Sequence, residues 1–300
     1  MKTRFGSRGS DLALTQTRMV MDRLRLEHPD AETSLRIIKT TGDNKPDAPL
    51  DEIGGLGAFT REIEVALLNR EIDVAVHSLK DLPTQQPDGL IIAAVAGRER
   101  PTDALISNGG HTLDTLPENA VVGTSSLRRK AQLTALRPDL RIRELRGNVP
   151  TRMRRVREGD LDAALIALAG LIRLGLSESA GIWEIPLERL LPAPGQGALA
   201  LETRSDDDRL IAMLAPLHDT AAAVAVQCER AALQAFGGGC RAPLGVYAHT
   251  QGDSVHVQAF AANMDSGKTI RLSRNAPAAM ADQLGRELGR ALREALEGRS

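Results

Sequence analysis

The sequence predicts an α/β protein of two similar lobes around a cleft, followed by a small α+β domain. Three observations predict this fold class. Apolar runs of strand length alternate with segments of helical spacing along most of the chain. Hydrophobic residues make up 42% of the chain but only six residues are aromatic, so an extensive core must be aliphatic. The chain has 300 residues, more than one core usually spans, so we expect several domains.

The first lobe is expected at residues 1–97 and, after a linker, at 197–216. Sequential β and α units predict a mainly parallel sheet. A strand at 198–202 is expected to cross back into this sheet, and Ser10 is a suitable N-cap for the first helix. The other expected elements are strands at 3–7, 35–40, 72–76 and 90–96, helices at 11–26 and 58–69, and a long loop at 41–57.

The second lobe is expected at residues 98–196 and the α+β domain at 217–300. Apolar runs in the second lobe predict strands at 104–107, 120–122, 140–145 and 162–167, with helices between them. In the last domain we expect a helix at 221–236, strands at 245–248, 254–262 and 269–273, and a final helix at 278–296.

The stretch from Val74 to Pro83 changes abruptly from apolar to polar. We expect His77, Ser78, Lys80 and Asp81 to leave the strand at its carboxyl end, where open α/β sheets place their ligands. A carboxylate beside an ammonium group can transfer protons or stabilise a developing cation. The alternative is a polar turn in which Lys80 and Asp81 are simply solvated.

Arginines recur after the predicted strand ends, twice beside a small-residue turn that opens a helix. Such turns, at 6–10 and 123–129, leave backbone N–H groups free to meet an anion. There is no P-loop or full GxGxxG, so a nucleotide is poorly supported. We interpret six arginines as binding one shared anionic ligand, and the alternative is a solvated helix face, which we prefer for Arg154, Arg155 and Arg157. The six are Arg8, Arg128, Arg129, Arg146, Arg152 and Arg173.

Charge and composition argue against several classes of partner. The formal net charge of -1 and the scarcity of aromatic residues both argue against nucleic acid. Residues 1–10 have no apolar signal core, and no run approaches the roughly 20 apolar residues of a membrane span. We therefore expect a cytoplasmic protein without a membrane partner.

The two cysteines, Cys228 and Cys240, have neither metal-site spacing nor enough partners for a disulfide framework. We expect no metal. Three glycines precede Cys240 and Arg241 follows it, which suits an uncrowded, reactive thiol. The alternative is an ordinary loop cysteine. Cys228 lies in an Ala-rich helix and is expected to be merely buried.

Taken together, seven motifs in order resemble the porphobilinogen deaminase (hydroxymethylbilane synthase) family over nearly the whole chain. They are Gly6-Ser-Arg-Gly-Ser-Asp-Leu-Ala-Leu14, Val76-His-Ser-Leu-Lys-Asp-Leu-Pro83, Val122-Gly-Thr-Ser-Ser-Leu-Arg-Arg129, Leu145-Arg-Gly-Asn-Val149, Ala169-Gly-Leu-Ile-Arg-Leu-Gly175, Pro194-Gly-Gln-Gly197 and Gly238-Gly-Cys240.

The resemblance implies a transferase of tetrapyrrole (haem) biosynthesis that condenses four porphobilinogen molecules into hydroxymethylbilane and releases ammonia each time. It also implies a covalent dipyrromethane cofactor joined to Cys240 by a thioether, with Asp81 as the catalytic carboxylate. The fold implied is two lobes like those of periplasmic binding proteins. The residues implied to bind acidic groups of cofactor or substrate are Arg8, Ser10, Lys80, Thr124, Ser125, Ser126, Arg128, Arg129, Arg146, Arg152 and Arg173.

One departure from the family pattern lies in the long loop, where Leu56 replaces a lysine found in many relatives, while Glu52 and Arg61 occupy other positions where relatives carry lysine. A charged lid is therefore not expected. A non-catalytic two-lobe binding protein for a small polyanion is the alternative function. Asp81 and Cys240 discriminate between the two, because a passive anion binder needs neither. We expect a monomer.

Overall fold

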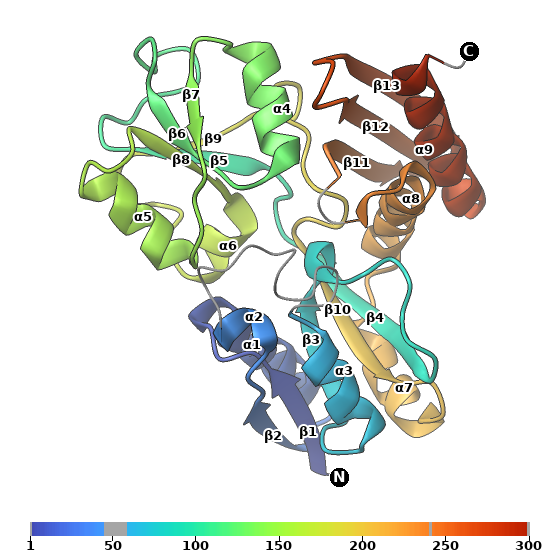
Figure 1. The fold of residues 1–300 in the computed structure, drawn as a ribbon. Helices are drawn as coiled ribbons and strands as arrows, with labels where there is room; N and C mark the ends of the chain where they lie inside the picture. Colours follow the sequence, from blue (N-terminus) through green and yellow to red (C-terminus); the bar gives the residue numbers. More distant parts are fainter. Residues whose placement is uncertain (1, 45–58, 240–241, 299–300) are drawn as a thin grey trace. The chain divides into compact units, whose positions relative to one another are not determined.

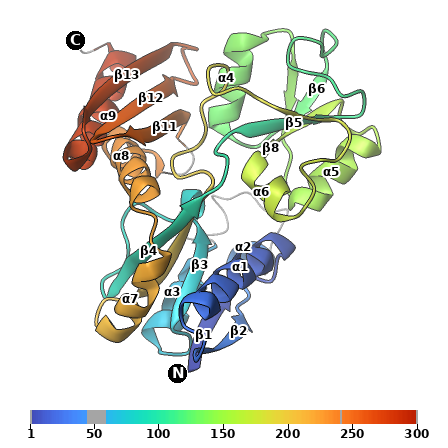
Figure 2. The same cartoon turned by 180° about the vertical axis from the view of Figure 1, so that it is seen from behind.

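The computed structural model describes residues 2–44, 59–239 and 242–298. Its contacts divide the chain into two compact units (Figures 1 and 2). Residues 1–99 with 198–223 form the first unit, which we call the first lobe. Residues 100–197 and 224–300 form the second unit, and we call these two segments the second lobe and the C-terminal domain. The three-domain boundaries expected from the sequence stay a prediction.

The first lobe contains a five-stranded sheet in the order β2-β1-β3-β10-β4. Strand β1 pairs in parallel with β2 and β3, whereas β10 is antiparallel to both β3 and β4. The predicted mainly parallel sheet with one crossing strand is therefore confirmed. The strands are β1 (Lys2–Ser7), β2 (Glu32–Ile37), β3 (Val74–Ser78), β4 (Leu90–Arg98) and β10 (Ala198–Arg204).

Helices cover both faces of this sheet because successive strand residues point to opposite sides. One face packs against α1 (Asp11–Glu27) and α7 (Asp208–Leu214), and the other against α3 (Arg61–Leu68). Helix α3 lies in front of the sheet in Figure 1, and α1 lies in front of it in Figure 2. Three single turns complete the lobe: α2 (Thr41–Asn44), η1 (Leu79–Asp81) and η2 (Ala215–Leu217).

The second lobe repeats this plan with the strand order β7-β6-β8-β5-β9. Strand β6 is parallel to β7 and β8, and β5 is antiparallel to β8 and β9. The prediction of two similar α/β lobes is thus confirmed. The strands are β5 (Asp103–Ser107), β6 (Val121–Gly123), β7 (Arg141–Arg143), β8 (Ala163–Ala167) and β9 (Ile182–Glu184), and the helices are α4 (Leu127–Leu136), α5 (Val149–Arg157) and α6 (Leu168–Arg173).

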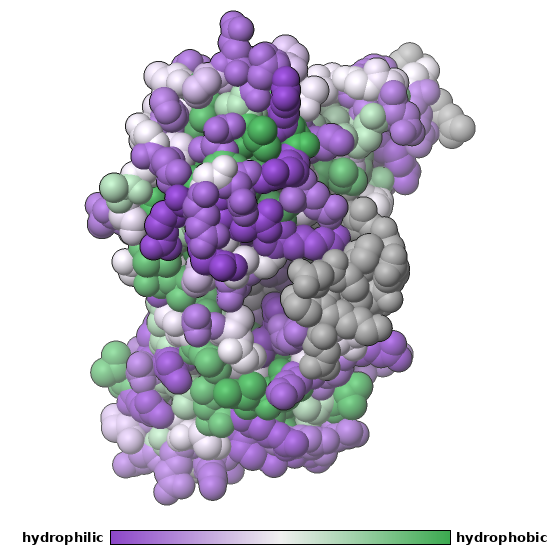
Figure 3. Space-filling view, turned by 60° about the vertical axis from the view of Figure 1, so that its left-hand side comes forward, coloured by the Kyte–Doolittle hydropathy of each residue, from purple (hydrophilic) through white to green (hydrophobic). Residues whose placement is uncertain are grey.

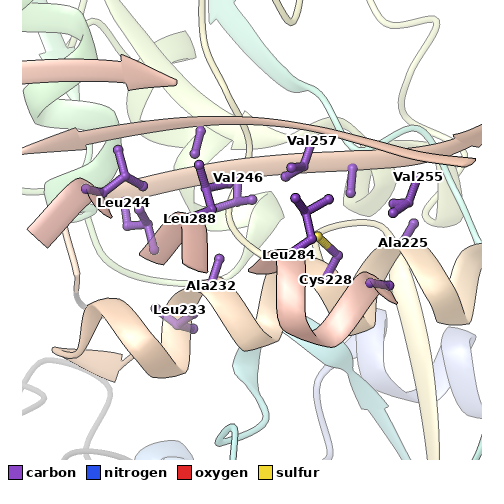
Figure 4. Close-up of a cluster of buried hydrophobic side chains, with 14 of the residues drawn as sticks. Ala225, Cys228, Ala232, Leu233, Leu244, Val246, Val255, Val257, Leu284 and Leu288 are labelled. Carbon is purple, nitrogen blue, oxygen red and sulfur yellow. The ribbon is translucent and has the colours of Figure 1, made fainter. Parts of the chain in front are cut away.

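The C-terminal domain is an antiparallel sheet, β11-β12-β13, covered by two helices. Figure 4 shows side chains of the helices and of the strands meeting in an aliphatic core that contains Cys228. The expected α+β domain is confirmed. Its elements are α8 (Thr220–Phe236), β11 (Leu244–Gln251), β12 (Ser254–Ala262), β13 (Thr269–Pro277), η4 (Ala278–Met280) and α9 (Ala281–Glu297).

Helices α8 and α9 touch through two glycines. A Cβ atom at Gly285 would lie 2.1 Å from the Cys228 carbonyl oxygen, and one at Gly289 would lie 2.3 Å from that of Ala232. Cys228 is fully buried, as predicted. Burial, with a contribution from nearby carboxylates, raises the pKa of its thiol to about 12. This thiol is therefore unreactive at neutral pH.

Three expectations about elements need correction. The strand expected at 35–40 is β2 at Glu32–Ile37, because it pairs along the whole of β1 from Lys2 onward. The loop expected at 41–57 begins with the helical turn α2, and its remainder, including Glu52 and Leu56, lies outside the described residues. Strand β9 was not predicted, because three residues give too short a pattern.

Hydrophilic residues cover most of the face shown in Figure 3, with apolar patches between them. In the first lobe, two of the exposed large apolar side chains, Val65 and Leu68, belong to α3. Within the described residues, no single helix is long and apolar enough to cross a membrane. One bent pair of helices, Asp208–Leu217 with Thr220–Phe236, has the length and the apolar composition for it, and only those two criteria support it.

Candidate active site at the carboxyl ends of the strands

The first lobe gathers its predicted site residues at one edge of the sheet. Strands β1 and β3 are parallel neighbours, with Phe5 opposite Val74, so the segments after them emerge side by side. Arg8 and Ser10 follow β1, while Lys80 and Asp81 lie in η1 directly after β3.

The turn η1 presents Asp81 to solvent. Leu79 and Leu82 are each only 1% exposed, and the Leu82 N–H donates to the Leu79 carbonyl oxygen at 3.2 Å. Asp81 between them is exposed, and its carboxylate has no hydrogen-bond or ion-pair partner among the residues that the structure describes. Two buried leucines thus hold an available carboxylate at the strand end, beside the half-buried Lys80.

His77 does not leave the strand, so that expectation is wrong. It lies inside β3, is buried, and its Nε2 is 3.0 Å from Oε2 of Glu202 on β10. A buried carboxylate on the neighbouring strand keeps the imidazole within the sheet. Ser78 ends β3 and exchanges hydrogen bonds with the Gln16 side chain of α1, at 3.0 and 3.2 Å.

Arg8 already has an acidic partner. Its Nη2 lies 2.6 Å from Oδ1 of Asp43, and its guanidinium stands over the Phe59 ring, 4.2 Å from the centroid. Burial alone would raise the pKa of Asp43, but hydrogen bonds from Arg8 and Thr40 hold it below its ordinary value. A ligand carboxylate would therefore share Arg8 with Asp43. Ser10 is the N-cap of α1, and its Oγ accepts the Ala13 N–H at 3.4 Å, as predicted for a cap.

In the second lobe, three hydroxyl side chains build the turn between β6 and α4. Thr124 Oγ1 accepts from the Ser126 N–H at 3.2 Å, and Ser126 Oγ caps α4 by accepting from the Arg129 N–H at 3.4 Å. Ser125 Oγ donates to the Leu145 carbonyl at 2.8 Å and accepts its N–H at 3.2 Å. The segments after β6 and β7 are thereby joined at the carboxyl end of this sheet.

Arg128 and Arg129 share one buried carboxylate. Asp103, at the start of β5, is fully buried and lies 2.7 Å from a terminal nitrogen of each arginine. Burial alone would raise the pKa of Asp103, but the two guanidinium charges hold this pKa far below its ordinary value. The Nε atoms of both arginines are buried and have no hydrogen-bond partner within the described ranges. Two cations therefore face one anion, with unused donors.

The other three predicted arginines donate to nearby oxygens. Arg146 Nε is 3.0 Å from Glu144 Oε1 in the segment after β7. Arg152 Nε donates to the Gly147 carbonyl at 2.8 Å. Arg173 ends α6, which follows β8 directly, and its Nη2 donates to the Gly197 carbonyl at 2.5 Å. All three are half-buried.

Cys240 lies outside the described residues. Gly237, Gly238 and Gly239, which lead to it from the end of α8, have φ values of 89°, 82° and 58°. This left-handed conformation favours glycine. In the part of the chain that the structure describes, no group of three or more His, Cys, Asp or Glu could hold a metal ion.

The sequence interpretation missed the acidic partners Asp43, Asp103 and Glu202. For two of them a signal exists: Asp103 opens the apolar strand at 103–107, and Glu202 directly follows the apolar run that begins β10. A carboxylate inside a buried strand implies a buried partner, since an unpaired charge there is costly. The identity of that partner is not in the pattern.

Two family models match the chain. Residues 3–212 match "Porphobilinogen deaminase, dipyromethane cofactor binding domain", and residues 223–294 match "Porphobilinogen deaminase, C-terminal domain". The chain belongs to the porphobilinogen deaminase family. It therefore has the domain that holds the family's dipyrromethane cofactor.

Individual relatives agree with the family models. A porphobilinogen deaminase of Desulforudis audaxviator is 47% identical over 94% of this chain and 91% of its own length. One from Chloroherpeton thalassium is 46% identical over 97% of this chain and 94% of its own length. Among solved structures, the methionine binding protein MetQ is similar with a TM-score of 0.44 at 15% identity, covering 72% of this chain and 89% of that chain.

Proposed function

We propose that this protein is a transferase with hydroxymethylbilane synthase activity. It condenses four porphobilinogen molecules head to tail into a linear tetrapyrrole and releases one ammonia at each addition, as a step of haem and porphyrin biosynthesis. The observation that carries this is Asp81, an exposed carboxylate without a partner among the described residues, held by two buried leucines at the strand end of a family member. A cytoplasmic monomer without nucleic-acid or membrane partners is part of the proposal.

The residues of the second lobe fit a polycarboxylate cofactor. Dipyrromethane carries acidic side chains, and Arg128 and Arg129 have buried Nε donors left over after binding Asp103. Cys240 would attach the cofactor through a thioether, and Thr124, Ser125 and Ser126 at the turn would add hydroxyl donors. When bound, the cofactor supplies the primer to which the first substrate is joined.

Asp81 would act on the substrate's aminomethyl group. The C–N bond of the protonated aminomethyl group breaks, its electron pair leaves with ammonia, and the positive charge passes to the substrate's pyrrole and methylene carbon. A carboxylate fixed close by stabilises that charge and can accept the pyrrole N–H. A C–C bond then forms to the free pyrrole carbon of the growing chain, which loses its proton. Lys80 beside Asp81 and Ser10 on the adjacent segment would hold the substrate's acidic side chains.

The arginines would divide between cofactor and substrate. Arg128 and Arg129 are buried and pre-arranged on Asp103, which suits a cofactor that stays in place. Arg8, Arg146, Arg152 and Arg173 are more accessible, which suits a chain that grows with each addition. Charge-assisted hydrogen bonds of this kind contribute roughly 1.5–3 kcal/mol each.

The test of this function is Asp81→Asn, which keeps the shape and removes the charge. Turnover, measured as ammonia release, should fall by at least about 10²-fold, the usual effect of removing one preorganised electrostatic group. Asp81→Glu keeps the charge but displaces it, so its rate should be intermediate. An Asn variant within a few-fold of the wild-type rate would return Asp81 to the role of a solvated turn residue.

Cofactor content is the control for this experiment. The intact mass of the wild-type protein should exceed that of its sequence by one dipyrromethane, and Asp81→Asn should be compared only in that loaded form. Cys240→Ala should lose the added mass, while Cys228→Ala, at the buried thiol, should keep it. A wild-type protein without added mass, made in cells that supply porphobilinogen, would contradict the proposal.

A further inference from the structure

Three titratable side chains are buried together in the first lobe, and the proposed chemistry uses none of them. Glu202 on β10 is 0% exposed, His77 on β3 is 6% exposed and Glu64 on α3 is 8% exposed. Buried acids are rare unless they are paired. Here two carboxyl groups face one imidazole, so the usual pairing does not account for both.

The strand register places this cluster beneath α3. Glu202 lies opposite Ala75, and residues two apart on a strand share a face, so His77 points to the same side as Ala75. Ala75 packs in the cluster that contains Ile63 and Leu67 of α3. The imidazole and the carboxyl of Glu202, 3.0 Å apart, therefore face the helix that carries Glu64.

One oxygen of Glu202 lacks a donor. Its Oε2 meets His77, but its Oε1 is buried without a hydrogen-bond partner in the described part of the chain. A buried acceptor left unsatisfied is costly. Burial, reinforced by the charge of Glu202, raises the pKa of Glu64, which favours the protonated form. A protonated Glu64 carboxyl, on the helix that covers this face of the sheet, could supply the missing donor.

The other charged groups around the cluster have partners or lie at the surface, although Arg204 Nε and Glu62 Oε2 are buried without a hydrogen-bond partner among the described residues. Arg204 of β10 donates to carbonyl oxygens of Leu67 and Ile72 and to Asp73 and Asp207. Arg61 of α3 is exposed, and together with the Thr60 hydroxyl and His77 it opposes the rise in the pKa of Glu64. Glu62 of α3 bonds to Thr41, and Lys80 and Asp81 lie in η1.

The cluster has access to solvent on one side. Glu64 lines an open groove of about 470 Å³ whose other walls are Arg61, Val65 and Leu68 of α3 and the segment from Pro83 to Pro87. A proton can therefore reach Glu64 without opening the sheet. The segment that forms this wall begins two residues after Asp81, so the chain runs directly from the proposed catalytic turn into the wall of the groove.

We propose that His77, Glu202 and Glu64 form a proton-sharing cluster that positions the turn bearing Asp81. His77 precedes Asp81 by four residues, and only Ser78, Leu79 and Lys80 lie between them. Loss of the shared proton would leave two buried anions in one site, and their repulsion would displace the strand end. These three are positioning residues, and the inference rests on the proposed role of Asp81.

The first experiment compares Glu202→Gln with the control Glu71→Gln in the loaded enzyme. Glu202→Gln should lower kcat about tenfold while leaving KM within about twofold, because loss of the carboxylate weakens the contact that holds His77 and so shifts the turn, whereas the binding groups stay in place. Glu71 pairs with Arg36 on the surface of the same lobe, so its amide variant should keep the wild-type rate. Glu202→Gln turning over like wild type, while Asp81→Asn is slow, overturns the inference and leaves the proposed function standing.

The second experiment tests proton sharing without any activity assay. Carboxyl ¹³C NMR of the folded protein should show a lower pKa for Glu64 in Glu202→Gln than in wild type, because a neighbouring negative charge has gone. A merely structural pair would lower the melting temperature and leave the titration of Glu64 in place. An unchanged titration overturns the inference.

Glu64→Gln keeps the proposal testable if Glu202→Gln does not fold. Because the pKa of Glu64 is higher in the folded than in the unfolded state, the folded state binds more protons, and stability falls as pH rises from the unfolded value through the folded one. Because loss of the shared proton would displace the turn that bears Asp81, we expect kcat of the wild type to decline as pH rises. Glu64→Gln should remove both this decline and the loss of stability. A variant with the wild-type pH profile in both stability and kcat contradicts proton sharing.

Discussion

The two lobes have the same sheet plan, and in each the antiparallel strand carries one fully buried carboxylate. In the first lobe it is Glu202 on β10, and in the second it is Asp103 on β5. Their surroundings are opposite. Glu202 meets His77 and lies near a second acid, Glu64, whereas Asp103 meets two guanidinium groups.

The comparison shows that the fold determines where the buried carboxylates lie, whereas the residues around them determine their charge state. The shared topology places a carboxylate at equivalent strands of both lobes. Two guanidinium groups hold the pKa of Asp103 low, whereas burial, reinforced by the charge of Glu202, raises the pKa of Glu64 on the helix that covers β10. The second lobe is left with excess positive charge, which suits carboxylates of a cofactor. The first lobe is left with an acid, Glu64, that favours its protonated form, which suits a role in positioning the strand end and not in binding charge.

Asp103→Asn should have the most severe consequence, because it removes the carboxylate that the two arginines share. Removing one partner of a buried ion cluster leaves uncompensated charge and typically costs about 3–5 kcal/mol. We therefore expect a large fall in the free energy of unfolding at pH 7 and poor cofactor loading. Because the folded pKa of Asp103 is depressed, its stabilisation is present above the unfolded pKa and is lost as pH falls through the folded value. The variant and wild type should thus converge in strong acid.

Asp114→Asn is the control for that substitution, because Asp114 pairs with Arg189 at the surface of the same lobe. It should leave unfolding nearly unchanged, since exposed ion pairs contribute little. If denaturant unfolding showed Asp103→Asn to be as stable as Asp114→Asn, the buried cluster would be of no consequence for the fold.

The next comparison sets Arg128→Leu against Arg8→Leu, one buried arginine from the second lobe and one accessible arginine from the first. Losing Arg128 should impair cofactor loading, because its buried donors are already arranged to hold a group that stays in place. Arg8→Leu should load normally and elongate slowly, with a loss of roughly 1.5–3 kcal/mol in kcat/KM. Intact mass and single-turnover ammonia release separate the two outcomes. Equal loading and equal turnover in both variants would contradict the division between cofactor and substrate.

Much of this arrangement could be predicted from the sequence, because it depends on local pattern. The change from apolar to polar residues placed the end of β3 two residues too early, at residue 76 instead of Ser78, but it still put Arg8 after β1 and Asp81 after β3. Helix caps such as Ser10 are also local, since the cap and its N–H partner lie three residues apart.

The partners of the polar groups could not be predicted in this way. His77 and Glu202 are 125 residues apart, and Arg128 and Asp103 are 25 apart, so tertiary pairing alone decides them. For the same reason His77 was misplaced. Its polarity predicted a strand end, whereas a carboxylate on another strand keeps it inside the sheet.

The smallest expected effect concerns Asp43, which competes with any ligand for Arg8. In Asp43→Asn the amide oxygen can still accept from Arg8 and Thr40, but the negative charge is gone, so Arg8 should attract a substrate carboxylate more strongly. We expect KM to fall by less than about tenfold, since a partly exposed ion pair contributes at most about 1 kcal/mol. Steady-state kinetics of the loaded enzyme measure this, with Asp22→Asn, at an exposed pair with Arg25, as the control. A rise in KM would show instead that Asp43 holds Arg8 in the orientation that substrate needs, and Arg8 and Asp43 would then act as one binding unit.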